Sequence, residues 1–232
     1  MKQILLATAM ALGPFAAQAG SVQIAVTDKD GKPTPDVVVL IEAPGRPAPS
    51  NVGVTATIAQ QDLRFQPFLT VVPAGSTLRF VNRDGYDHHV RSMPSGPLGS
   101  TPAVQNIELR LDASAPAPRS ADDDYQNRPP PVHKKSGTSS VDVKVDKAGP
   151  IGLGCHLHSS MRGQVYVSAT PWFAKTDANG VARIENVPEG AVELSLWHPD
   201  QLQEQAVQRV QATAAPLTLT GQLNFVPRRR RS

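Results

Sequence analysis

The sequence contains little cysteine, few aromatic residues and no long internal hydrophobic run. Aromatic residues make up 5% of the 232 residues, and cysteine occurs once, at position 155. One cysteine excludes a disulfide-stapled scaffold. The chain also lacks a Ser-His-Asp set, a pair of carboxylates on a helix face and a glycine-rich phosphate loop. Catalysis has no support in the sequence, and we expect a protein that is not an enzyme.

The basic charge of the chain is small and local. The formal net charge is +3 at pH 7, and residues 228–231 are four consecutive arginines that exceed this total by themselves. A nucleic-acid-binding surface needs Lys and Arg spread over one face, so we expect no nucleic-acid partner. The basic tail, residues 227–232, is typical of a solvated chain end. Docking of the tail to an acidic partner or membrane is the less favoured alternative.

The N-terminus has the pattern of an export signal. Lys2 precedes an apolar run over residues 4–12, and Ala17 and Ala19 form a small-x-small cleavage site. The run is too short to span a bilayer, and no later run is long enough, so we expect no membrane span. The pattern predicts a signal peptide over 1–19, a mature chain from Gly20 and a periplasmic location.

The remainder of the chain reads as short strands. Apolar and polar residues alternate within 21–43, 54–90, 141–145 and 163–167, and 22 prolines disfavour long helices. Residues 21–43 read as two strands around a turn. Residues 113–138 are rich in Pro, Ala, Ser and Asp without periodicity, which predicts a loop insertion. The sequence therefore predicts an all-β fold, with one short helix over 201–212.

Metal-binding residue types surround the single cysteine. Cys155, His158 and Met161 follow the spacing C-x-x-H-x-x-M. A lone thiol in an exported protein is buried and inert, engaged with another chain, or bound to a metal. Thiolate, imidazole and thioether together favour copper over magnesium or calcium. A buried cysteine and a methionine packed in the core are the ordinary alternatives.

A second histidine is available from the segment 80–90. Asn82, His88 and Val90 form the pattern N-x(5)-H-x-V, which resembles the first-ligand segment of plastocyanin-like cupredoxins. Residues 149–161 are similar to the C-terminal ligand loop of amicyanin and pseudoazurin. The resemblance covers residues 54–168 without the insertion. As a whole, the chain resembles exported cupredoxin-like proteins often labelled methylamine-utilisation-like.

This resemblance implies a Greek-key cupredoxin β-sandwich over residues 54–169, with one mononuclear copper ion. The implied ligands are His88, Cys155, His158 and Met161. Nitrogen and sulfur ligands bound at about 2.0–2.3 Å should lie about 3–4 Å apart, with the methionine sulfur further out. His89 and His156 occupy no ligand position, and in an extended strand His89 points away from His88.

The two ends of the chain carry a second resemblance. Gly180 and Gly190 mark turns within 170–226, and this segment resembles carboxypeptidase-regulatory-like β-sandwich repeats. Residues 20–45 resemble the start of the same module. We expect a small sandwich built from both chain ends, and a single enlarged sandwich is the alternative.

Three functions follow as hypotheses. The first is one-electron transfer to a redox partner protein. The second is copper delivery or storage, with a copper acceptor as the partner. The third is an interaction module with a vestigial metal site, and an intact set of ligands disfavours it.

Overall fold

The computed structural model describes residues 19–46, 50, 52–96, 99–113 and 138–228. Within these ranges the chain forms sixteen β-strands and no α-helix. None of the described segments is a helix with the length and hydropathy needed to cross a membrane. The all-β prediction is confirmed. The predicted signal peptide lies outside the described residues apart from Ala19, and so does the insertion apart from its two end residues.

The central sandwich, residues 54–168, contains two sheets that face each other across one core. The first sheet has the order β4-β3-β6-β9 and consists of β3 (Thr55–Gln61), β4 (Arg64–Gln66), β6 (Ser76–Asn82) and β9 (Ser140–Val145). The second has the order β5-β11-β10-β7-β8 and consists of β5 (Leu69–Pro73), β7 (His88–Met93), β8 (Glu108–Leu111), β10 (Gly149–Cys155) and β11 (Arg162–Ser168). The consecutive strands β6 and β7 therefore lie in different sheets, and the loop 83–87 crosses between them.

Alternation of side chains builds the core of the central sandwich. In β6, Leu78 and Phe80 are fully buried, whereas Arg79 between them is exposed and pairs with Asp142 of β9. The same core contains Cys155 and other residues of the ligand segments, so the candidate site is continuous with the packed interior.

The terminal sandwich is built from both ends of the described chain. Its three-stranded sheet has the order β13-β1-β16 and consists of β1 (Ala19–Thr27), β13 (Val181–Pro188) and β16 (Leu217–Gln222). Its four-stranded sheet has the order β12-β2-β14-β15 and consists of β2 (Val38–Glu42), β12 (Phe173–Lys175), β14 (Gly190–Trp197) and β15 (Gln208–Ala212). A separate cluster of buried apolar side chains fills the space between these sheets.

One expectation for the chain ends needs correction. The predicted helix over 201–212 is wrong, because residues 208–212 form β15 and residues 201–207 have no regular structure. Val210 of β15 pairs with Val192 of β14, and burial against that partner outweighs helix propensity. The two strands predicted within 21–43 are present as β1 and β2, which lie in opposite sheets.

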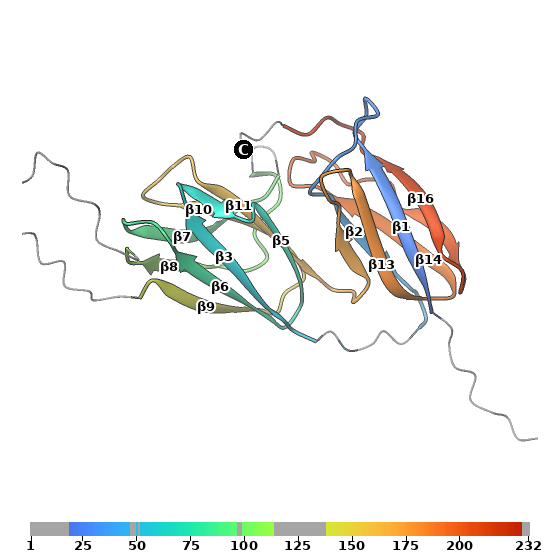
Figure 1. Cartoon of the computed structure of the whole chain (residues 1–232), viewed down its shortest axis with the longest axis horizontal. Coiled ribbons are helices and arrows are strands. Elements are labelled where there is room, and N and C mark those ends of the chain that lie inside the picture. The colour runs from blue at the N-terminus through green and yellow to red at the C-terminus, as the bar shows by residue number, and fades with distance from the viewer. Residues whose placement is uncertain (1–18, 47–49, 51, 97–98, 114–137, 229–232) are drawn as a thin grey trace, which may run out of the picture.

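The two sandwiches lie side by side and touch (Figure 1). The ring of Tyr166 in β11 packs on Trp197 of β14, with ring centroids 4.8 Å apart. Lys175 of β12 donates a hydrogen bond to the carbonyl oxygen of Leu69 in β5, at 3.2 Å. Since β5 is the edge strand of its sheet, the terminal sandwich covers part of an otherwise open edge.

Candidate metal centre

Strand pairing brings His88 and Cys155 to the same end of one sheet. His88 is the first residue of β7 and Cys155 is the last residue of β10. These two strands are antiparallel neighbours, and Val90 lies opposite Cys155. The side chains of His88 and Cys155 are 0% and 2% exposed, so both groups are shielded from bulk water.

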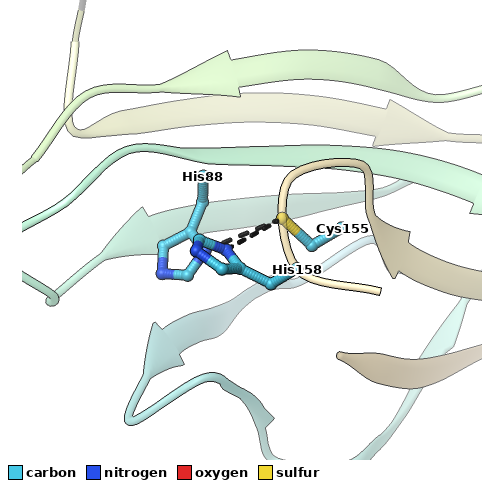
Figure 2. A group of neighbouring side chains, drawn as sticks. All are labelled: His88, Cys155 and His158. Carbon is cyan, nitrogen blue, oxygen red and sulfur yellow. Dashed lines mark hydrogen bonds between the residues drawn. The ribbon is translucent and has the colours of Figure 1, made fainter. Parts of the chain in front are cut away.

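His158 completes a cluster of three donor atoms. The Cys155 sulfur lies 3.8 Å from Nδ1 of His88 and 3.5 Å from Nδ1 of His158. All three atoms fall within 4.8 Å of one another, and Figure 2 shows both imidazole rings directed at the sulfur. No other group of three His, Cys, Asp or Glu side chains in the described part of the chain meets this spacing.

Met161 belongs to the turn that carries His158. Its backbone N–H donates to the carbonyl oxygen of His158 at 3.0 Å. Its side chain is 1% exposed and is part of the buried cluster that contains Cys155. The turn thus brings the Met161 backbone against that of His158, and the expected role of the Met161 sulfur as an axial ligand stays a prediction.

The histidines next in sequence to the cluster face elsewhere. The ring of His89 stacks on that of His156, with centroids 5.6 Å apart and an interplanar angle of 20°. Nε2 of His89 lies 3.6 Å from a carboxylate oxygen of Glu108 at the surface. The backbone N–H of His89, however, points inward and donates to the Cys155 sulfur at 3.4 Å.

Asp84 is a functional candidate that the sequence analysis did not identify. Its Oδ2 atom lies 2.8 Å from Nε2 of His88, and both side chains are buried. An ionised carboxylate can only accept a hydrogen bond, so Nε2 of neutral His88 carries the proton. Nδ1 is then left with a free lone pair on the side of the ring that faces Cys155.

Burial and hydrogen bonding set the protonation states of this pair. Burial lowers the pKa of His88, and the neighbouring Asp84 carboxylate only partly opposes that effect. Burial by itself would raise the pKa of Asp84, but the hydrogen bonds that its carboxylate accepts outweigh burial and hold the pKa below the ordinary value. The structure therefore pairs a neutral imidazole with an ionised carboxylate.

The same carboxylate fixes a tight hairpin turn. Asp84 accepts hydrogen bonds from the N–H groups of Asp62, at 2.8 Å, and Leu63, at 3.4 Å. These residues join β3 to β4 and have φ values of 54° and 58°. A two-residue turn with two positive φ angles normally contains Asn-Gly. A non-glycine residue in that conformation costs about 1–3 kcal/mol, and the surrounding structure must hold it there.

Asn82 holds the loop that carries Asp84. Its Oδ1 atom accepts a hydrogen bond from the backbone N–H of Asp84 at 2.9 Å. Its Nδ2 atom donates to the carbonyl oxygens of Tyr86, at 2.7 Å, and Asp112, at 2.9 Å. One buried amide thereby fixes both the start of the loop 83–87 and its contact with the end of β8.

The ring of Tyr86 packs against the one half-exposed member of the cluster, His158, and exposed apolar side chains lie on the neighbouring segments. The ring of Tyr86 packs edge-on against His88 and His158, with centroids 5.2 and 5.3 Å away. Tyr86 is 40% exposed, and Leu157, next to His158 in sequence, is 56% exposed. Leu63 on the hairpin turn is 42% exposed. His158 is thus the cluster residue closest to solvent.

No family model and no curated protein matches this chain. Several solved structures are similar to part of it. A Cu(I) form of an amicyanin mutant is 16% identical, with 49% of this chain and 82% of that chain covered and a TM-score of 0.32. A purple cupredoxin from Nitrosopumilus maritimus is 15% identical, with 50% and 99% covered and a TM-score of 0.32. A pseudoazurin from Sinorhizobium meliloti is 15% identical, with 51% and 76% covered and a TM-score of 0.32.

Proposed function

We propose that this chain is an exported copper-binding protein of the cupredoxin type, which carries single electrons to a partner protein. The observation that carries the proposal is the convergence of one thiol and two imidazole nitrogens at a buried point. His88 and Cys155 are 67 positions apart in sequence. Two imidazoles and one thiolate in this grouping are the ligand set of blue-copper electron-transfer sites.

The donor atoms fit a single small ion. Three nitrogen and sulfur ligands at bond lengths of about 2.0–2.3 Å should lie about 3–4 Å apart. The sulfur lies at 3.8 Å and 3.5 Å from the two imidazole nitrogens. The free lone pair on Nδ1 suits His88 to act as a ligand. The Cys155 sulfur accepts a hydrogen bond from the His89 N–H, which helps to hold it in place as a second ligand. We infer that Met161 is a fourth, weaker ligand from the same turn.

A bound copper ion would supply one-electron redox chemistry. The protein would hold His88 and Cys155 in place through the paired strands β7 and β10, which limits rearrangement between oxidation states. His158 is half-buried and would provide the shortest path to solvent. Its exposed apolar neighbours Leu157 and Tyr86 suit contact with a partner protein, since they exclude water from a docked surface.

The test is the visible and electron-spin-resonance spectrum of the purified protein with copper(II). A closed thiolate site should give an intense visible absorption. Cys155→Ser should abolish this absorption and leave the β-fold in place. His89→Ala and His156→Ala are the matched controls, because each removes an imidazole next to a proposed ligand and should retain the colour. A copper(II) spectrum without the thiolate band would contradict the proposal.

Redox cycling in the presence of a copper chelator separates electron transfer from copper delivery. The burial of His88 and Cys155 predicts that the ion stays bound through repeated oxidation and reduction. Retained metal and reversible colour are the expected results. Loss of copper to the chelator on reduction would instead support a delivery or storage protein that passes copper to an acceptor.

Export is a separate part of the proposal. It is supported by the N-terminal pattern of Lys2, the apolar run and the small residues before Gly20. The mature protein recovered from the periplasm should begin at Gly20. Intact mass gives the answer, and exported protein that retains residues 1–19 would overturn this part.

A further inference from the structure

The Asp84 carboxylate is placed to act on the metal centre without touching the metal. Its Oδ2 atom lies 2.8 Å from Nε2 of His88, on the side of the ring that faces away from Cys155. His88 is completely buried, so no water competes for that N–H group. Histidine ligands that donate their second N–H to a carboxylate are held in one tautomer and orientation and become more basic ligands.

We propose that Asp84 is a positioning residue of the copper site, which fixes the tautomer of His88 and favours copper(II) over copper(I). This inference rests on the proposed function. Asp84 acts through the His88 imidazole, because its charge lies one ring away from the proposed ligand atom Nδ1. Negative charge at that distance stabilises the more highly charged oxidation state more strongly.

Asp84 also joins the metal centre to the protein surface. The same carboxylate binds the N–H groups of the positive-φ turn at Asp62 and Leu63. Two roles therefore meet in one side chain: it orients a ligand, and it holds a turn that exposes an apolar leucine. A substitution at Asp84 must separate these roles before its effect on copper can be interpreted.

Asp84→Asn separates charge from hydrogen bonding. The Asn side chain has the same shape, and its one carbonyl oxygen still accepts the proton of Nε2, but its NH2 group then faces the N–H of Asp62 and cannot accept that hydrogen bond. The variant is therefore made in the Leu63→Gly background, where the turn should persist without the carboxylate, and is compared with Leu63→Gly alone. We expect this variant to keep the visible absorption, since the ligands are unchanged. Its copper(II) affinity should fall about 10-fold, at the lower end of the range for mutation of an outer partner of a histidine ligand, because the hydrogen bond is kept and only the charge is lost. Its copper(I) affinity should fall less, so the reduction potential should rise.

Asp87→Asn is the matched control. Asp87 is an acid in the same loop, one position from His88, but its carboxylate binds Arg110 and the N–H of Ala113. Removal of this charge should leave both copper affinities close to those of the parent. Equal losses in the Asp84 and Asp87 variants would show a general effect of loop charge and overturn the proposal.

Asp84→Ala combined with Leu63→Gly tests the hydrogen bond itself. Glycine adopts the positive φ of residue 63 without strain, so the turn should persist without the carboxylate. The readout is ¹⁵N NMR of the metal-free protein at one neutral pH. The parent and the Leu63→Gly single variant should show His88 protonated only at Nε2, and the double variant should show a mixture of tautomers.

The outcomes distinguish this inference from the proposed function. A parent protein that binds no copper overturns the proposed function, whereas the NMR measurement needs no metal. A single His88 tautomer in the double variant overturns the positioning role of Asp84. A copper(II) affinity of Asp84→Asn equal to that of its Leu63→Gly background, or equal losses for copper(I) and copper(II), overturns its preference for copper(II).

Discussion

Two glycines in the strand that ends at Cys155 should respond very differently to the same substitution. Gly152 and Gly154 both lie in β10 and face β7. A Cβ atom at Gly152 would lie 2.6 Å from the carbonyl oxygen of Met93 and 2.8 Å from that of Pro94. A Cβ atom at Gly154 would overlap the sulfur of the flexible Met93 side chain. Alanine at the first position therefore meets backbone, and alanine at the second meets a side chain that can move.

The magnitudes follow from what must move. The Cβ of Gly152→Ala is about 1 Å inside ordinary non-bonded contact. Overpacking costs about 1–3 kcal/mol, and a clash with paired backbone belongs at the upper end. In either variant, the replacement of glycine reduces the conformational entropy of the unfolded chain, which raises the free energy of unfolding by about 0.4–1 kcal/mol. Gly152→Ala should thus lower the free energy of unfolding by about 2 kcal/mol, and Gly154→Ala should leave it nearly unchanged.

Urea unfolding of the metal-free protein, followed by far-UV circular dichroism, measures the difference. With a denaturant slope of about 2 kcal/mol/M, Gly152→Ala should unfold at about 1 M less urea than Gly154→Ala. Circular dichroism is preferred to tryptophan fluorescence, because Trp172 lies in the core of the terminal sandwich and Trp197 contacts Tyr166 of the central one.

Displacement of β10 from β7 should also move Cys155 away from His88 and weaken copper(II) binding. Equal urea midpoints for the two variants would refute this account of the strand contact.

Three further predictions concern other buried groups. The metal-free protein should lose stability as the pH falls below 6.5, because the folded state lowers the pKa of His88 and holds its ring neutral. It should lose more stability at lower pH, where Asp84, whose pKa is also lowered, becomes protonated. Urea midpoints measured as a function of pH test both steps. Gln60→Met should raise the free energy of unfolding by about 1–3 kcal/mol, because the buried Gln60 amide has no hydrogen-bond partner among the described residues; a midpoint below that of the parent would contradict this. Trp197→Leu should lower the free energy of unfolding by about 0.5–1.5 kcal/mol more than the loss of buried apolar area alone, because it removes the ring contact with Tyr166. A double-mutant cycle with Tyr166→Leu, measured by chemical unfolding, tests this coupling.

The sequence could predict the grouping of donors because ligand spacing is local. Cys155 and His158 share one turn, and His88 follows a recognisable strand, so each segment carries its own signal. The all-β fold followed in the same way from alternation along single strands. The predicted helix over 201–212 failed because pairing with β14, rather than any local preference, decides the structure of residues 208–212.

Other features depend on contacts that local patterns do not encode. Asp84 reaches both His88 and the turn at Leu63 only because the loop 83–87 folds back at the end of β6. An acid four positions before a proposed ligand is the one signal that could have drawn attention to it. The parallel pairing of β1 with β16 joins residues such as Val22 and Leu217, and no periodicity in either strand identifies the other.

That parallel pairing also sets an order of events during synthesis. β1 emerges from the ribosome early, but one of its two neighbours, β16, ends at Gln222. All strands of the central sandwich are complete by Ser168. Domains fold as units once their sequence is available, and contacts between distant residues form slowly. The central sandwich can therefore fold first, whereas β1 lacks its partner β16 until residues 217–222 have been synthesised, and only then can the terminal sandwich close.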